Sequence, residues 1–450
     1  MKKLIWTGIL SISQITSVFC QGLFESSTTP ADDQSATSVE WNGYVRGSVY
    51  GGSEDYDFTS LFGEMAIQPK LNYNSAFFYS DLRLRSGYFF GEDTVISQVK
   101  ELYAGYNGDK FQVYLGNQIV QWGRTDGFNP TNNITPNDYF FFSAEPDDQK
   151  LSNTMLRVKY LFSPHIDLDL VAIPIYKPSV YRYDLFSMVE GANFISTVYP
   201  EQKLSNGSFA GRLNFEFDKA GFSFSYFTGY DPFYGFRVDN IDLTVATPVI
   251  QFAPDFYRKK TIGGDFAFFL GTWIIRGEAA YNLTEDYEDN MYIPNPGLNY
   301  VVGLEHNFAG FTAIFQYIGN YASDFTELRQ PPTITDPTDP LAQLQYNIGL
   351  INYEASLFNR KIFQQQEETN HTLFLSLNKS FAHDVLSVGL TGYYDLTAES
   401  YMFRPSLSWK INDSLESTLG GSYMDGPDKA IFNYAGPVMN GIYIEFKANF

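Results

Sequence analysis

Cysteine, positive charge and long apolar runs are all scarce in this chain of 450 residues. A single cysteine excludes a disulfide scaffold. No run of about 20 apolar residues follows the amino-terminal segment, which excludes a helical membrane protein. The 30 Lys and Arg against 51 Asp and Glu give a net charge of −21, and such a chain would repel the phosphates of nucleic acid. We therefore expect no nucleic-acid partner.

Aromatic residues, in contrast, are abundant. They make up 18% of the chain, with 33 Tyr and 41 Phe. This supply excludes a disordered acidic protein, which would lack such side chains.

The amino end has the pattern of a targeting segment. Two lysines precede the apolar stretch 4–12, and Cys20 ends a more mixed segment. A basic region followed by a short apolar region predicts a signal peptide over residues 1–20. Cys20 lies where a lax lipobox would place a lipidated cysteine, so simple cleavage and lipidation both stay open. Residues 21–40 are rich in Ser, Thr and Asp and predict a flexible periplasmic leader.

From residue 41 onward the dominant pattern has period 2. At the carboxyl end Ile442 and Ile444 share one face, while Tyr443 and Glu445 share the other. This alternation places apolar side chains on one face of a sheet and polar side chains on the other. The predicted strands have about 10–13 residues, which suits tilted strands that cross a bilayer better than the shorter strands of globular sheets.

The connections between these strands alternate in length. Short turns such as 107–109 and 382–384 separate longer links such as 122–151 and 321–368. Short periplasmic turns and long extracellular loops produce this alternation. We therefore predict an all-β fold: a single transmembrane antiparallel up-and-down β-barrel over residues 41–450, with about 18 strands in a range of 16–20. The predicted strands lie near 41–51, 61–73, 75–88, 97–107, 110–121, 152–162, 165–175, 206–217, 220–230, 258–270, 272–282, 298–308, 310–320, 369–380, 384–394, 400–410, 414–424 and 438–450.

Two structural alternatives stay open at this point. Residues 344–363 fit either a further hairpin or a short amphipathic segment, and the whole chain fits a secreted β-sandwich or β-helix less well. Aromatic residues recur near predicted strand ends, as in the interfacial girdles of membrane barrels, which favours the cell outer membrane. Phe450 ends an alternating last strand. A terminal Phe is the usual signal for the outer-membrane assembly machinery, which we predict as a partner.

The most distinctive run covers residues 110–138, KFQVYLGNQIVQWGRTDGFNPTNNITPND. It resembles a largely uncharacterised outer-membrane barrel family in which a G-x-Q-x-x-x-W-G strand leads into a long N-P-x-D loop. Its layout is also similar to that of alginate-export-type porins. The resemblance implies an 18-stranded barrel and, for some members, association with an inner-membrane RND-type exporter. The matching residues are Gly116, Gln118, Trp122, Gly123 and the following Arg124.

The same run has a physical interpretation of its own. Gly116 and Gly123 permit close packing or a bulge, and Trp122 can anchor a loop base through its large apolar area. Two prolines stiffen the loop that follows by fixing φ. The loop 122–151 is then either a constriction folded into the lumen or an ordered surface loop.

Charged residues on the inward faces are expected to line the lumen. Cross-strand ion pairing would stabilise a wet interior, whereas an arginine ladder would attract an anionic solute. The expected inward charges are Glu64, Lys70, Asp81, Arg83, Arg85, Arg157, Lys159, Asp167, Asp169, Arg212, Glu216, Arg276, Glu278, Glu305 and Arg404. The solute-contacting candidates among them are Arg83, Arg85, Arg157, Lys159, Arg212, Arg276, Glu278 and Arg404.

Acidic clusters in predicted outer loops have two interpretations. They are either solvated loops or places where divalent ions bridge to lipopolysaccharide, because hard cations favour carboxylate oxygens. The main cluster comprises Glu285, Asp286, Glu288 and Asp289. We predict outer-membrane lipid and lipopolysaccharide as partners, and no resident metal or cofactor.

The function classes follow from this fold. The four histidines show no H-E-x-x-H spacing and no G-x-S-x-G is present, so we predict that the chain is not an enzyme. We predict a porin-like channel that passes a small or polymeric solute, or the outer-membrane conduit of an export system. Loops 122–151 and 176–205 would narrow its lumen. The alternatives are a non-conducting adhesin or structural barrel, and an outer-membrane barrel enzyme.

Overall fold

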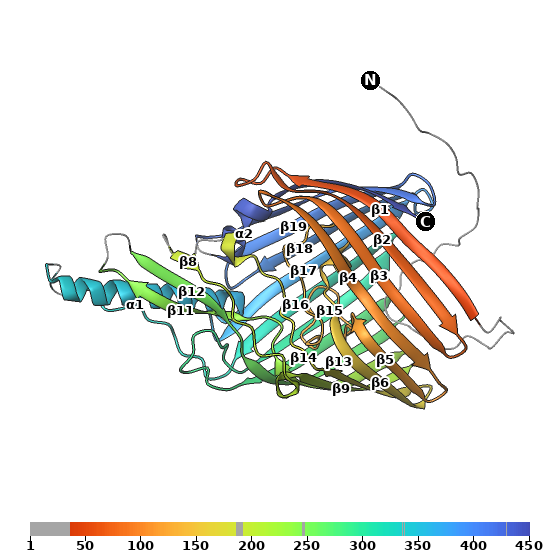
Figure 1. Cartoon of the computed structure of the whole chain (residues 1–450), viewed down its shortest axis with the longest axis horizontal. Coiled ribbons are helices and arrows are strands. Elements are labelled where there is room, and N and C mark those ends of the chain that lie inside the picture. Colours follow the sequence, from red (N-terminus) through yellow and green to blue (C-terminus); the bar gives the residue numbers. More distant parts are fainter. Residues whose placement is uncertain (1–36, 186–191, 245–247, 335, 337, 429) are drawn as a thin grey trace, which may run out of the picture. The chain divides into compact units, whose positions relative to one another are not determined.

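The computed structural model describes residues 37–185, 192–244, 248–334, 336, 338–428 and 430–450. The predicted signal peptide, Cys20 and leader residues 21–36 lie outside these ranges. Eighteen antiparallel strands form one sheet that closes where β1 pairs with β21 (Figure 1). The prediction of an up-and-down barrel of 18 strands is confirmed. The barrel strands are β1 (Thr37–Gly51), β2 (Phe58–Tyr73), β3 (Ala76–Phe89), β4 (Glu92–Asn107), β5 (Phe111–Gln118), β6 (Asn153–Ser163), β7 (Ile166–Ile173), β9 (Ser208–Phe217), β10 (Ala220–Tyr230), β13 (Arg258–Leu270), β14 (Trp273–Thr284), β15 (Gly297–Phe308), β16 (Phe311–Ala322), β17 (Thr369–Phe381), β18 (Leu386–Asp395), β19 (Ser400–Lys410), β20 (Leu415–Asp425) and β21 (Gly441–Asn449).

Side chains on the strands alternate between an exposed apolar face and a buried polar face. On β3, Leu82 and Leu84 are exposed, whereas Asp81, Arg83 and Arg85 are buried. A continuous exposed apolar surface of this kind suits the hydrocarbon of a bilayer and not water. The sandwich alternative is wrong, because these apolar rows form the outside of a closed wall. Further exposed members include Val45, Phe224, Ile262, Val302, Phe315, Leu390, Leu419 and Ile444.

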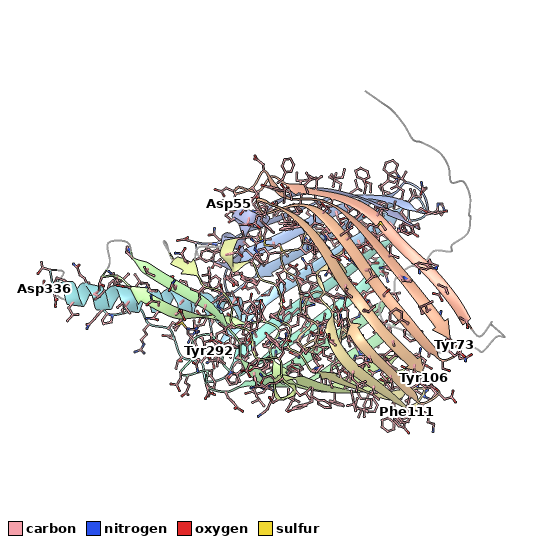
Figure 2. The ribbon with its side chains drawn as sticks, in the orientation of Figure 1. Asp55, Tyr73, Tyr106, Phe111, Tyr292 and Asp336 are labelled. Atoms are coloured by element: carbon pink, nitrogen blue, oxygen red, sulfur yellow. The ribbon has the colours of Figure 1, made fainter. Side chains whose placement is uncertain are left out.

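The two ends of the barrel differ. Tyr73, Tyr106 and Phe111 lie at the end with short turns, opposite the end where Asp55 lies (Figure 2). Exposed rings at this level match an interfacial aromatic girdle. We call these the short-turn end and the long-loop end, which face the periplasm and the outside in barrels of this type.

Three predicted boundaries near the strand ends need correction. β1 begins at Thr37 and not at residue 41. Residues 89–96, which the predicted strands 75–88 and 97–107 leave as a longer link, instead hold a tight turn at Phe90 and Gly91, both with positive φ, and the start of β4. Two such residues in succession build a compact hairpin turn whose twist matches the strands. The last strand begins at Gly441 and not at 438, because a helix precedes it.

Two helices lie in the long links of the described chain: α1 (Pro340–Ile362) and α2 (Ile431–Met439). The side chain of Asp339 accepts a hydrogen bond from the backbone N–H of Leu341 at 2.9 Å, which satisfies one free donor at the start of α1. Pro340 begins the helix with its fixed φ. The hairpin alternative for 344–363 is therefore wrong. Within the described ranges, each helix is too short or too polar to serve as a membrane span.

A second, smaller sheet lies in the long links and contributes no strand to the barrel. β11 (Gly235–Asp242) and β12 (Val249–Asp255) form a hairpin, and β8 (Ala192–Phe194) adds in parallel to β12. The helix α1 packs against this sheet, and the Asn359 amide joins the backbone of Phe236 through two hydrogen bonds of 2.8 and 2.6 Å. We call β8, β11, β12 and α1 the crown. Its presence shows that the predicted loop 176–205 contributes, in part, to this sheet.

The seam between the first and last strands depends on a close approach at Gly43. Its backbone exchanges hydrogen bonds of 3.0 and 2.9 Å with Phe450. A Cβ placed on Gly43 would lie 2.5 Å from the carbonyl oxygen of Ala66 and 2.6 Å from the Phe450 ring. Phe450 thus lies at the closure of the barrel. Its role as an assembly signal stays a prediction.

We expect Gly43→Val to reduce the yield of closed barrel, because the new side chain overlaps a backbone carbonyl. Overpacking of this kind costs about 1–3 kcal/mol of stability. The folded fraction is measured by heat-dependent mobility on a gel, and stability by urea unfolding. Gly47→Val on the same strand is the matched control, since its Cβ would lie no closer than 4.0 Å to another atom. Equal losses in both variants would contradict the seam argument.

Candidate functional site

The link 122–151 between β5 and β6 folds into the barrel, and we call it the lumen loop. Arg124 reaches Asp265 on β13, Gly127 reaches Gln316 on β16, and Asp148 reaches Arg46 on β1. These strands lie in different sectors of the wall. The inward-folded interpretation is confirmed, and the surface-loop interpretation is wrong.

The predicted anchor residues lie at the base of this loop. Trp122 is 2% exposed and packs in a buried cluster with Ile134 and Met155. Its Nε1–H donates to Asp169 Oδ2 at 3.1 Å. A buried tryptophan supplies a large apolar contact while its polar end stays satisfied. Gln118 donates from Nε2 to the carbonyl of Met155 at 3.2 Å.

Two glycines of the motif allow the chain to turn into the lumen. Gly116 has a φ of 134° and Gly123 a φ of 108°, a region that side chains disfavour. A Cβ at Gly123 would lie 2.2 Å from the side chain of Asn129. The motif therefore encodes a tight path for the backbone as well as an anchor.

Arg124 fixes the first half of the loop to the far wall. Its guanidinium donates to Asp265 at 2.6 Å and to Glu216 at 2.5 Å. The carboxylate of Glu278 accepts from the backbone N–H groups of Arg124 and Thr125, at 2.5 and 2.7 Å. Charge-assisted hydrogen bonds of this kind are the strong ones. Glu278, a solute-contacting candidate, therefore holds the loop.

The tip of the lumen loop crosses to β16 and β18. The N–H of Gly127 donates to Gln316 Oε1 at 3.0 Å, and the Tyr393 hydroxyl donates to the carbonyl of Gly127 at 2.7 Å. Phe128 packs against the buried cluster of Ile318 and Phe374. The first half of the loop thus spans the lumen from one wall to the other.

The second half of the lumen loop is held by an ionic network around Asp148. This carboxylate accepts from Arg46 at 2.5 Å, from Arg83 at 2.7 Å and from the Ser143 hydroxyl at 2.7 Å. Burial alone would raise the pKa of Asp148, but Arg46 and Arg83 outweigh burial and hold this pKa below its ordinary value. A depressed carboxyl pKa stabilises the fold above the unfolded pKa and loses that effect as pH falls. The network is therefore intact at neutral pH.

A β-bulge adds one further contact to this network. The pairing of β3 with β4 shifts between Asp81 and Leu82, which leaves Lys100 as an extra residue on β4. Lys100 is 3% exposed, and its ammonium donates to the carbonyls of Asp148 (2.7 Å) and Lys150. Bulges often re-aim a side chain in this way. Lys100 thereby binds the backbone of the loop.

Most of the predicted lumen arginines have carboxylate partners. The ion pairs are Arg83–Asp81 at 2.8 Å, Arg85–Glu64 at 2.5 Å, Arg157–Asp169 at 2.7 Å, Arg212–Asp265 at 3.1 Å, and Arg276 with Asp126 and Glu305 at 2.5 and 2.6 Å. Lys159 lies opposite Asp169 in the register of β6 and β7. These contacts support the ion-pairing interpretation. Solute contact by these residues stays a prediction.

Arg404 on β19 differs from these arginines. Among the described residues, no carboxylate forms an ion pair with it. Thr391 lies opposite it, and its charge is close enough to act on the hydroxyls of Tyr50, Tyr393 and Tyr443. The lumen loop contacts the first two of these tyrosines, through Gly127 and Phe142. Arg404 therefore lies between the two places where the loop meets this wall.

Several residues of the site were absent from the predicted set. Arg46 and Asp265 follow the alternation of their strands and could have been found by it. Lys100 could not, because the bulge breaks the period. Asp148 stands next to Asp147 in a predicted outer loop, a pattern that is typical of a solvated acidic loop. The structure buries Asp148 at 8% exposure.

The acidic cluster and the histidines lie outside this network. Glu285 pairs with Lys260 at 3.1 Å, and in the described ranges no group of three or more His, Cys, Asp or Glu side chains is arranged to hold a metal. His165 and His383 lie in short turns, His306 stacks on Trp273, and His371 contacts the hydroxyl of Tyr317 at 2.5 Å. These separate positions bring no two histidines together.

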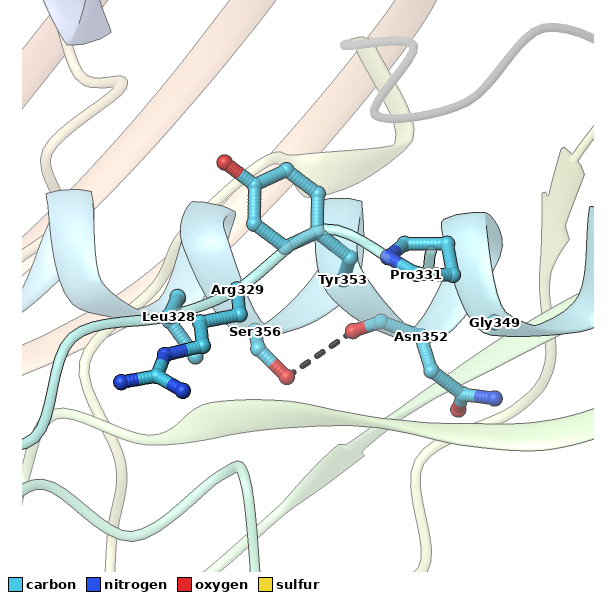
Figure 3. A pocket seen from close by; sticks show the side chains of 7 residues that line it. All are labelled: Leu328, Arg329, Pro331, Gly349, Asn352, Tyr353 and Ser356. Carbon is cyan, nitrogen blue, oxygen red and sulfur yellow. Dashed lines mark hydrogen bonds between the residues drawn. The ribbon is translucent and has the colours of Figure 1, made fainter. Parts of the chain in front are cut away.

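A shallow groove of about 340 Å³ belongs to the crown, where the segment 328–331 crosses α1 (Figure 3). Arg329 and Tyr353 line it. The Ser356 hydroxyl beside them donates to the carbonyl of Asn352 at 2.8 Å, within the helix. Because the groove lies on the crown and not on the lumen wall, we assign it no role in passage through the barrel.

No family model and no curated protein matches this sequence. Among solved structures, the chain is similar to OpdK of Pseudomonas aeruginosa with vanillate, at a TM-score of 0.55 and 7% identity, covering 92% of this chain and 98% of OpdK. OccK5 (OpdH) of the same organism gives 0.52 and 9%, covering 92% and 97%. OccAB3 of Acinetobacter baumannii gives 0.52 and 9%, covering 92% and 99%. These likenesses show that the chain has the fold of the 18-stranded outer-membrane porins.

Proposed function

We propose that this chain is a porin-like channel of the outer membrane, narrowed by the lumen loop. The observation that carries the proposal is the charged inner wall of a closed barrel together with a loop that is bound across its lumen. A barrel of 18 strands leaves an aqueous bore that such a loop constricts without breaking the wall. The structural neighbours are channels and not enzymes, which supports this assignment.

The solute passes, in this proposal, along the wall of β18 to β20. Arg404 provides a positive charge there that no described carboxylate neutralises. Neighbouring lumen-facing residues offer hydroxyl groups, among them Thr391, Ser406 and Thr418. OpdK was solved with vanillate, an aromatic carboxylate. The combination supports a small organic anion as the solute.

Arg404→Glu is expected to reverse the ion preference of the channel. The substitution places a negative charge at the narrow part of the path, where low dielectric strengthens its field. The measurement is the reversal potential in a planar bilayer with a tenfold KCl gradient. We expect anion preference in the natural chain and cation preference in the variant.

Arg212→Gln is the matched control for this measurement. Arg212 also faces the lumen, but it pairs with Asp265, which keeps Arg124 as a partner. We expect a much smaller change in reversal potential from this substitution. Unchanged ion selectivity in the Arg404→Glu variant would show that Arg404 does not lie on the solute path.

A non-conducting structural barrel is the second candidate. The observation that favours it is the breadth of the contacts of the lumen loop, which bind strands β1, β7, β13, β14, β16 and β18. A loop held so widely would block the lumen if no path remained beside Arg404. Conductance separates this candidate from the channel.

Service as the outer-membrane conduit of an RND-type exporter is a further proposal. It is supported by the resemblance of residues 110–138 to a barrel family with such members. An export partner would contact the short-turn end, which faces the periplasm in this type of barrel. Co-purification of the chain with an inner-membrane exporter after crosslinking in a native host tests the proposal. Failure to recover such a complex would contradict it.

A further inference from the structure

The described part of the long-loop end of the barrel carries many acidic residues and, on β13, a run of three cations. Acidic residues border the strand ends around this rim, in keeping with the net charge of −21. β13, in contrast, begins with three consecutive cations, Arg258, Lys259 and Lys260. The acidic positions include Glu54, Asp55, Glu92, Asp93, Glu288, Glu367, Glu368, Glu399 and Asp425.

Two of these three cations point outward, away from the lumen. Arg258 and Lys260 are exposed and share a face with Ile262, which is 58% exposed on the apolar belt. Lys259 points the other way and pairs with Asp231 at 2.8 Å. The outward pair therefore lies directly above the lipid-facing surface, at the level where head groups begin.

A third exposed cation, Lys203, lies in the link that precedes β9. The Arg258 guanidinium contacts the carbonyls of Ser205 and Gly207, each at 3.5 Å. These contacts bring the neighbouring Lys203 and Leu204 to the same patch. Leu204 is 84% exposed, so an apolar side chain projects beside the charges. We call Lys203, Leu204, Arg258 and Lys260 the basic rim patch.

The charges of the basic rim patch are available to a ligand. Lys260 pairs with Glu285, and Lys203 pairs with Glu201, but the side chains of these two carboxylates are 80% and 76% exposed. Exposed ion pairs contribute little and exchange readily with a stronger partner. The Arg258 guanidinium lies over the Tyr230 ring at 5.1 Å, and no described carboxylate pairs with it. The ring orients the guanidinium and leaves N–H donors for an anion.

We propose that the basic rim patch binds the phosphorylated head group of an outer-leaflet glycolipid. Guanidinium and ammonium groups match phosphate in charge and hydrogen bonding, and Ile262 below them contacts the acyl chains. The patch faces lipid and not the lumen, so this site is independent of solute passage. Among the partners expected from the sequence, lipopolysaccharide is the one with this chemistry.

Native mass spectrometry of the full-length chain in detergent tests the proposal. The probes are lipid A with both phosphates and enzymatically dephosphorylated lipid A. We expect bound adducts with the phosphorylated form, and we expect Arg258→Gln with Lys260→Gln to weaken this binding by about tenfold. Lys203→Gln alone, in a loop outside the barrel sheet, should weaken it by a smaller factor. Heat-dependent gel mobility confirms that each variant is folded.

Lys379→Gln provides the matched control. Lys379 lies on β17 near the short-turn end, where it sits over the rings of Phe311 and Phe381 at 4.2 and 5.2 Å. Its removal takes away one cation far from the basic rim patch, and lipid A binding should not change. Bilayer conductance of the rim variants should equal that of the natural chain, which separates this site from the channel.

Three results would overturn the proposal. The first is equal lipid A binding by the natural chain and the folded double variant. The second is equal binding of the phosphorylated and dephosphorylated probes. Displacement of lipid A by an equal concentration of inorganic phosphate would also reject a lipid site in favour of a free-phosphate site.

Discussion

Asp148→Ala is expected to widen the channel, with single-channel conductance rising by about twofold or more as the second half of the lumen loop leaves the wall. Asp148 binds Arg46 and Arg83 at 2.5 and 2.7 Å. Removing one carboxylate from a buried ionic network costs about 3–5 kcal/mol, because its buried partners lose a counter-charge. Arg46 keeps Glu64 and Arg83 keeps Asp81. The loss of one negative charge beside these two guanidinium groups should also increase anion preference. Planar-bilayer recording measures both quantities.

Asp147→Ala is the control for this experiment. Asp147 precedes Asp148 in the chain, but its side chain is 83% exposed and pairs at the surface with Lys150. We expect the conductance of the natural chain from this variant. Asp148→Asn keeps the shape of the side chain and should give an intermediate result. Unchanged conductance in Asp148→Ala would show that the ionic network does not hold the loop.

Trp122→Ala is expected to cause a large loss of stability. The indole is 2% exposed, and its removal leaves a cavity between Ile134, Met155 and the wall. Replacing a buried tryptophan with alanine costs about 3–5 kcal/mol. Asp169 would also lose the hydrogen bond from the indole N–H. The free energy of unfolding is measured by urea denaturation in detergent or lipid.

A lipid-facing tryptophan provides the comparison. Trp409 lies on β19 and is 51% exposed, so Trp409→Ala should cost much less than Trp122→Ala. Trp122→Phe keeps most of the ring volume and should fall between the two. Equal costs at the two positions would mean that the loop base contributes no packing of its own.

The barrel could be predicted from the sequence because its pattern is local. Each strand carries its own alternation of lipid-facing and lumen-facing residues, as in Leu82, Arg83 and Leu84 on β3. The sequence pattern did not predict the turn at Phe90 and Gly91, because Phe is not a residue expected at positive φ. The pattern also did not predict the boundary between α2 and β21, since α2 continues the apolar character of β21.

For the crown, the local sequence indicates the helix but not the sheet against which it packs. Asp339 and Pro340 form a cap and first turn that indicate the start of α1. The partner of this helix, the sheet of β8, β11 and β12, comes from links more than 80 residues earlier in the chain. Contacts over such separations are set by tertiary packing. A sequence pattern could indicate the helix but not what it covers.

The candidate site could likewise be predicted from the sequence only in part. The loop-base residues from Gly116 to Arg124 form a recognisable run, and the structure places them where the chain enters the lumen. The ionic partners of the loop do not form a run. Asp148 is 102 residues from Arg46, and Arg124 is 141 residues from Asp265. Only the closed wall brings these charges together, and their pairing leaves Arg404 as the lumen arginine with the freest charge.

The most direct test of the account compares the conductance of the natural chain with that of a variant in which residues 139–149 are replaced by a short Gly-Ser linker. The lumen loop constricts a water-filled bore in this account. We therefore predict a small but finite single-channel conductance for the natural chain and a larger one for the variant. Zero conductance from correctly folded natural chain in the bilayer would contradict the channel, whatever the variant shows.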